Sequence, residues 1–259
     1  MVRKFGQWTA MLCAALLMAG AADAPARAQA QANGGDQALY TYVALWGVPR
    51  PEWGEIEKFY KDAEPTLNKL IADGTIVSWG NGRSWIHDES GLTHENWVTA
   101  TSFEKIQRAL NAVRQALPQP AAFSHSKHLD VMHHATIHGA KPGASGNGML
   151  WVADYQVKPE QMEEFGRIFE NDIKPLFDEQ IAAGTILSYS LNFEAVHTGP
   201  ASNVSIAYVL PNAAAIDKFQ AALEAYGAGH PETGPAMQAT MDFTAHRDYV
   251  YELIGFAQK

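Results

Sequence analysis

Two copies of a His-x-Asp pattern are the residues of this sequence best suited to proton transfer. They are His128 with Asp130 and His246 with Asp248, each in a stretch with the residue types of a β-strand. Side chains two positions apart on a strand point to the same face, so each histidine can contact its carboxylate. A histidine titrates near pH 6.5 and, beside a carboxylate, can act as a general acid or base. The alternative is structural, with polar pairs that bond loop backbone where a strand reaches solvent.

Two further histidines occupy corresponding places in the two halves of the chain. His87 in the first half matches His197 in the second, and both follow a predicted strand. Recurrence favours a shared role over coincidence, and we include both among the candidates for proton transfer.

Aromatic residues provide candidates for binding a substrate. The candidates are Trp46, Trp79, Trp85, Tyr155 and Tyr189. Rings of this kind bind a planar, aromatic ligand by stacking. The two tyrosines correspond to Trp46 and Trp79 and add a hydroxyl that could donate to a substrate oxygen. For each single ring, an ordinary core position is the alternative.

These positions correspond because the chain contains an internal repeat. Residues 71–79 read IADGTIVSW and residues 181–189 read IAAGTILSY. In each copy, Gly74 or Gly184 can adopt the left-handed conformation that ends a helix, and a β-branched run then starts a strand. The spacing of about 110 residues exceeds the roughly 20 to 50 residues of solenoid repeats, so it indicates a duplicated domain.

Each copy has the hydrophobic periodicity of a β-α-β-β-α-β unit, which is the ferredoxin-like order. We expect one unit over residues 37–138 and a second over residues 149–259. Residues 139–148 are rich in glycine and predict a flexible linker.

The order of strands in such a unit predicts where the candidate side chains lie. The second and fourth strands are the outer strands of each sheet, so if the two sheets close on each other, outer strands of different units meet. We therefore expect His87 to approach His246 and Asp248, and His197 to approach His128 and Asp130.

Residues 1–30 have the features of a secretory signal peptide. Arg3 and Lys4 precede an apolar segment, and Ala28-Gln29-Ala30 is a cleavage site of the A-x-A type. We expect a periplasmic or secreted protein without disulfides or thiol chemistry, because the only cysteine, Cys13, lies in the removed segment. The formal net charge of −9 argues against nucleic acid and anionic membranes as partners.

Two consecutive β-α-β-β-α-β units, each with a proline (Pro65 or Pro175) inside its first helix, resemble the dimeric α+β barrel superfamily. The resemblance implies an α+β fold in which two antiparallel sheets pack into one barrel with helices outside. Members bind small hydrophobic molecules. Some are cofactor-free oxygenases, isomerases or lyases, whereas chlorite dismutases and dye-decolorising peroxidases hold haem.

The residues and the resemblance together predict an enzyme. It would act on a small hydrophobic, aromatic compound by cofactor-free His/Asp acid–base chemistry of the lyase, isomerase or oxygenase type. We expect no cofactor, no metal ligands and no nucleic-acid or membrane partner, in a monomer or a homo-oligomer. One alternative is a binding protein without catalysis. The other is a haem or metal protein that uses His246 or the histidines between His125 and His138.

Overall fold

The structure is a computed structural model, and it describes residues 38–87, 89–196 and 202–259. The expected signal peptide and His197 lie outside the described residues. The first copy of the repeat begins at β1 and ends at β4. Its elements are β1 (Leu39–Gly47), α1 (Trp53–Ala72), β2 (Ser78–Ser84), β3 (His94–Ala100), α2 (Phe103–Ala116) and β4 (Lys127–Ala140).

The second copy follows the same order with a more divided first helix. Its strands are β5 (Ser145–Val157), β6 (Ser188–Val196), β7 (Asn203–Leu210) and β8 (Met241–Gln258). Its helices are α3 (Met162–Ile168), a π-helical turn (Phe169–Ile173), α4 (Lys174–Ala182), α5 (Ala213–Gly229) and α6 (Thr233–Thr240). Pro175 lies in the first turn of α4, directly after the π-helical turn, whereas Pro65 lies inside a continuous α1.

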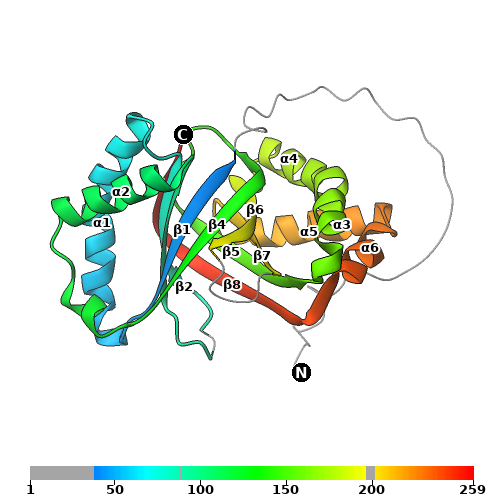
Figure 1. The fold of residues 1–259 in the computed structure, drawn as a ribbon. Coiled ribbons are helices and arrows are strands. Elements are labelled where there is room, and N and C mark those ends of the chain that lie inside the picture. Colours follow the sequence, from blue (N-terminus) through cyan, green and yellow to red (C-terminus); the bar gives the residue numbers. More distant parts are fainter. Residues whose placement is uncertain (1–37, 88, 197–201) are drawn as a thin grey trace.

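The eight strands form one closed antiparallel barrel in the order β1-β3-β2-β8-β5-β7-β6-β4. Within each half the order is that of a ferredoxin-like sheet, with the second and fourth strands outermost. The halves join through β2 with β8 and through β4 with β6, so the predicted pairing of outer strands is confirmed. The predicted α+β class with helices outside the barrel is also confirmed (Figure 1).

The repeated helix ends adopt the predicted backbone. Gly74 has φ +75° and Gly184 has φ +74°, which is the left-handed region that glycine reaches without strain. Each glycine follows the last turn of α1 or α4 and turns the chain towards β2 or β6.

Residues 139–148, which the composition predicts as a linker, contain the end of β4 and the start of β5. Only residues 141–144 lie outside these strands. Backbone pairing does not need side chains, and at Gly148 a side chain would not fit, because a Cβ there would lie 2.4 Å from the carbonyl oxygen of Leu210.

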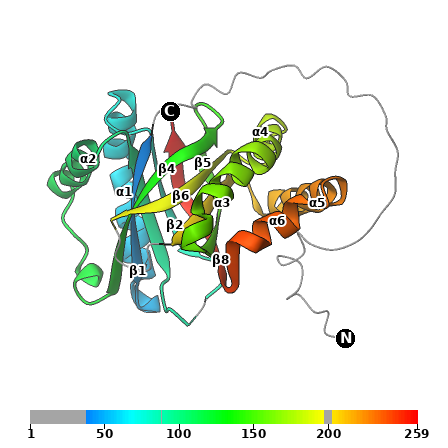
Figure 2. The same ribbon diagram turned by 45° about the vertical axis from the view of Figure 1, so that its right-hand side comes forward.

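The helices cover the barrel on two opposite sides. Helices α1 and α2 lie against the strands of the first half, and α3 to α6 lie against those of the second (Figures 1 and 2). The main cores fill the space between helices and strands, and include Leu67, Trp79 and Ile106 on one side and Phe165, Phe177 and Phe219 on the other. No helix in the described ranges has the length and apolar character needed to span a bilayer.

Alternation along the strands separates two faces. In β1, Ala44 and Trp46 face the helices, whereas Thr41, Val43 and Leu45 face the inside of the barrel. The inward-facing side chains of all eight strands form the wall of the space inside the barrel. They determine which ligand this space can hold.

Candidate active site

The inside of the barrel contains a cavity of about 1020 Å³. Eight strands are just enough to enclose a space that side chains can fill or that one small ligand can occupy. Here much of the wall is built from small residues, including Ser190, Ser205 and Ala207 on the adjacent strands β6 and β7. The volume is that of a site for a small molecule.

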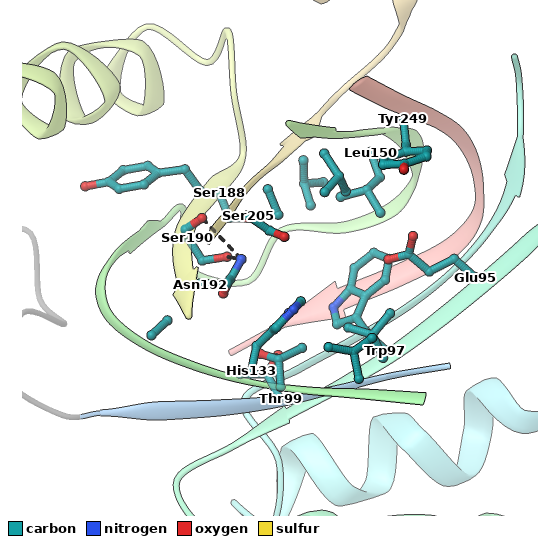
Figure 3. Close-up of a pocket in the computed structure, with 18 of the residues that line it drawn as sticks. Glu95, Trp97, Thr99, His133, Leu150, Ser188, Ser190, Asn192, Ser205 and Tyr249 are labelled. Carbon is teal, nitrogen blue, oxygen red and sulfur yellow. Dashed lines mark hydrogen bonds between the residues drawn. The ribbon is translucent and has the colours of Figure 1, made fainter. Parts of the chain in front are cut away.

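Aromatic and aliphatic side chains form one part of the wall. Trp97 on β3, Leu150 on β5 and Tyr249 on β8 face the cavity (Figure 3). The indole of Trp97 lies over Gly80 of β2, where a Cβ would come within 2.0 Å of the ring. Because Gly80 has no side chain, the Trp97 indole can pack against β2 and form part of the wall.

Glu95 places a carboxyl group in the same cavity. It lies on β3 two residues before Trp97, with only 6% of its surface exposed, and accepts a hydrogen bond from the hydroxyl of Tyr251. Burial raises the pKa of Glu95 to about 8, although the hydrogen bond from Tyr251 lowers it and the charge of Asp154 raises it. At neutral pH Glu95 is mostly protonated and can act as a proton donor.

Asp154 is a second carboxyl group in the wall. It lies opposite Ser205 in the β5–β7 pairing, and the Ser205 hydroxyl donates to it over 2.5 Å. Burial raises its pKa, and repulsion from Asp248 and Glu194 acts in the same direction, whereas the bond from Ser205 and the charge of His246 lower it.

Two histidines of β4, His133 and His138, line the cavity together with these carboxyl groups. His133 lies next to Glu194 of β6 in the strand register, and Figure 3 shows its ring pointing into the space that Asn192 also faces. Burial lowers the pKa of His133 to about 4, against the attraction of Glu194. The imidazole is therefore neutral at physiological pH and can accept a proton.

The predicted pair of His128 and Asp130 is formed, with 2.8 Å between Nε2 and the carboxylate oxygen. The imidazole stacks on Trp46 with 3.7 Å between ring centroids, and Tyr42 donates its hydroxyl to Asp130 over 2.5 Å. These side chains lie on the outer face of the barrel, where Phe123 packs against Trp46.

The second copy repeats this arrangement. His246 bonds Asp248 over 3.1 Å and stacks on Tyr155 with 4.5 Å between centroids, and Trp151 donates to Asp248 over 2.8 Å. Burial lowers the pKa of His246, but its bonds to Asp248 and to the carbonyl of Asp154 raise it overall. Both His-x-Asp pairs thus face away from the cavity, and their catalytic role stays a prediction.

The other predicted residues are dispersed. His87 is exposed and contacts Trp53 of its own half at 5.7 Å between ring centroids, and Trp85 has 56% of its surface exposed. Trp79 and Tyr189 border the cavity wall, but the Trp79 Nε1 donates to Asn68 over 3.0 Å and the Tyr189 hydroxyl to Asp178 over 2.7 Å. The substrate-binding role of the predicted aromatic residues likewise stays a prediction.

The predicted residues Trp79, Tyr155 and Tyr189 line the cavity, whereas most of the other lining residues were not predicted. Trp46 and the His-x-Asp residues alternate with inward-facing neighbours, which include Leu45, Leu129 and Arg247, and Asp154 lies next to Tyr155. The histidine run 133–134 and the acidic–aromatic pair of Glu95 and Trp97 were the available signals.

Within the described ranges, no three histidine, cysteine, aspartate or glutamate side chains lie close enough together to hold a metal ion. No model of a protein family matches this sequence. The search of curated proteins gives no match either.

Several solved structures share the fold over nearly their whole length. A proposed monooxygenase of Lactobacillus acidophilus has a TM-score of 0.64 at 10% identity, with 86% of this chain and 97% of that chain covered. A proposed monooxygenase of Fusobacterium nucleatum has a TM-score of 0.65 at 12% identity, with 86% and 95% covered. An anthrone oxidase-like protein has a TM-score of 0.52 at 9% identity, with 86% and 94% covered. The chain therefore has the dimeric α+β barrel fold that its sequence resembles.

Proposed function

We propose that this chain is a secreted enzyme that binds a small aromatic compound inside the barrel and moves protons to and from it. The observation that carries the proposal is the presence, in one cavity, of a neutral imidazole (His133), a protonated carboxyl group (Glu95) and an aromatic wall that includes Trp97. Groups whose pKa values are displaced by their surroundings are typical of catalytic sites.

The two titrating groups suit opposite roles. His133 as general base would take a proton from a carbon or oxygen of the substrate, and the electron pair of the broken bond would stay on the substrate. Glu95 as general acid would return a proton at another atom, or donate a hydrogen bond to an oxygen on which negative charge develops. Trp97 would hold the ring of the substrate by stacking.

The same first step serves two reaction types. If Glu95 returns the proton, the reaction is an isomerisation. If the electron pair of the deprotonated substrate reduces O₂ as co-substrate, the reaction is an oxidation without a bound cofactor. The names of the structural neighbours support the second type, which remains part of the proposal.

Anthrone is a suitable first probe, because it is planar and aromatic and has an acidic methylene group. Under nitrogen in D₂O, the enzyme should accelerate deuterium exchange at that methylene. In air, anthrone and O₂ should give anthraquinone and water in equal amounts. His133→Asn should lower the exchange rate by about 10²-fold or more, whereas Asp217→Asn on the exposed face of α5 is the matched control.

The proposal fails if exchange does not exceed the rate in buffer, or if His133→Asn and Glu95→Gln leave it unchanged. Saturable binding of anthrone without exchange would instead support the alternative of a binding protein.

Export is a separate part of the proposal. The protein recovered from the periplasm or medium of a producing cell should have the mass of a chain that begins at Gln31, after cleavage at Ala28-Gln29-Ala30. A mass that retains residues 1–30 would contradict it.

A further inference from the structure

One side of the cavity presents hydrogen-bond acceptors at neighbouring positions on three adjacent strands. Asn192 of β6 and Asp154 of β5 both lie opposite Ser205 of β7, one on each side of it. All three line the cavity, and Figure 3 shows Asn192 and Ser205 facing its interior. Glu194 lies two positions along β6 from Asn192 and lines the same wall.

The Asn192 side chain has an unused acceptor. Only 4% of the residue is exposed. Its Nδ2 donates to the Ser190 hydroxyl over 2.9 Å and to the Ser190 carbonyl over 3.3 Å, which fixes the amide. Its Oδ1 is buried without a partner among the described residues. A buried polar atom without a hydrogen-bond partner destabilises the folded protein unless a ligand or water bonds to it.

The cationic side chains near this wall form no ion pair with Asp154, although the charge of His246 lowers the pKa of Asp154. Arg247 lies opposite Asp154 in the strand register, but its Nη1 donates to the carbonyls of His246 and Thr244 over 2.7 and 3.3 Å. Lys174 pairs with Asp178 over 2.6 Å. His133 is neutral because its pKa is lowered to about 4. Within the described part of the chain, no ion pair joins Asp154 or Glu95 to a cationic side chain.

From this arrangement we infer that the occupant of the cavity is an aromatic compound with a positively charged amino group, whose N–H donors bond Asp154 and the Oδ1 of Asn192. An ammonium group supplies several donors and no acceptor, which matches a wall that offers acceptors. Its charge would balance the buried carboxylate, and bonds of this charged kind are shorter and stronger than neutral ones. The aromatic part would then lie against Trp97, Leu150 and Tyr249. The inference rests on the proposed function, since it specifies the substrate class of the same cavity.

Calorimetric titration with three matched probes tests the inference on the wild-type protein. The probes are 2-phenylethylamine, 2-phenylethanol and 3-phenylpropionate, which share a phenyl ring on a short chain and differ in charge. At pH 7 the amine should bind at least tenfold more tightly than the alcohol, and the carboxylate most weakly. Equal binding of amine and alcohol, or tighter binding of the carboxylate, would overturn the inference while leaving an aromatic site in place.

Two variants test whether the preference for the amine over the alcohol depends on Asp154. Asp154→Asn should reduce the ratio of amine to alcohol affinity to about one while the alcohol still binds, whereas Asp217→Asn, on the exposed surface, should keep the ratio. Thermal melting checks that both variants fold. If Asp154→Asn does not fold, Asn192→Leu takes its place and should lower the ratio as well.

Failure of the proposed function gives a different result. If none of the three probes binds, or if Trp97→Ala leaves the affinity of all three unchanged, both the aromatic site and the inference are rejected. An unchanged ratio in Asp154→Asn, with binding intact, rejects the inference alone.

Discussion

Replacing Glu95 by glutamine should make the stability of the protein less sensitive to pH. Glutamine keeps the shape of the protonated carboxyl group and cannot ionise. In the wild type, the pKa of Glu95 is raised from 4.5 to about 8 in the folded state. Between these values the folded protein binds more protons than the unfolded chain, so this group's contribution to the free energy of unfolding falls as pH rises.

The size of the effect follows from the difference between the pKa of Glu95 in the folded protein and its pKa in the unfolded chain. Each pKa unit corresponds to about 1.4 kcal/mol, so the free energy of unfolding of Glu95→Gln minus that of the wild type should increase by about 3 kcal/mol from pH 5 to pH 8. Comparing the two proteins removes most of the contribution of Asp154 and His133, because both titrate in both proteins. Most of the increase in this free-energy difference should occur at pH values above the ordinary pKa of a glutamate and below about 8.

Urea denaturation at pH 5, 6, 7 and 8 measures the difference, with Glu224→Gln on the exposed face of α5 as the control for replacing a carboxylate by an amide. A difference that stays constant across this range, or that decreases with pH, would refute the account of Glu95 as a buried, protonated acid.

Three further predictions follow from the cavity. The kcat/KM for proton exchange should be constant between about pH 4 and about pH 8, because His133 gains a proton below this range and Glu95 loses one above it. A pH profile governed by a group that titrates near pH 6.5 would argue against these two residues. The added methyl group of Gly80→Ala should clash with the Trp97 ring. It should lower the free energy of unfolding by about 1–3 kcal/mol in urea titrations and weaken the binding of aromatic probes. Unchanged stability together with unchanged binding would contradict the packing described. His128→Ala, which removes the stacking partner of Trp46, should cost about 1 kcal/mol of stability and keep turnover; a folded variant without turnover would support the outer-face pairs as catalytic.

The fold was predictable because it is encoded twice. The motif around Gly74 and Gly184 sets the same helix end and strand start in each half, and the periodicity of the intervening residues gives the order of elements. Closure into a barrel was implied by the resemblance to the dimeric α+β barrel superfamily, and the pairing of the outer strands followed from it. The contact within each His-x-Asp pair was predictable from the two-residue period of a strand.

The face of the barrel that holds the site was not predictable in the same way. Along β4, His128, His133 and His134 all have the residue type for chemistry, and a shift of one position decides whether a side chain faces the helices or the cavity. Both faces of β4 carry a mixture of polar and apolar residues, so polarity does not distinguish them. The roles of Glu95 and Asp154 depend on burial and on neighbours from distant strands, which composition and spacing do not reveal.

The predicted linker also differs from the structure, for a local reason. Glycine-rich residues 139–148 pair as strand ends because their backbone can approach neighbouring strands closely.

The most direct test of the central claim, that the inside of the barrel is the binding site, is the anomalous diffraction of crystals soaked with 4-bromophenol. The account predicts a bromine peak inside the barrel, in contact with Trp97 and within reach of Glu95 or His133. A peak only on the outer face, beside Trp46 and His128, or an empty barrel at saturating probe, would contradict it.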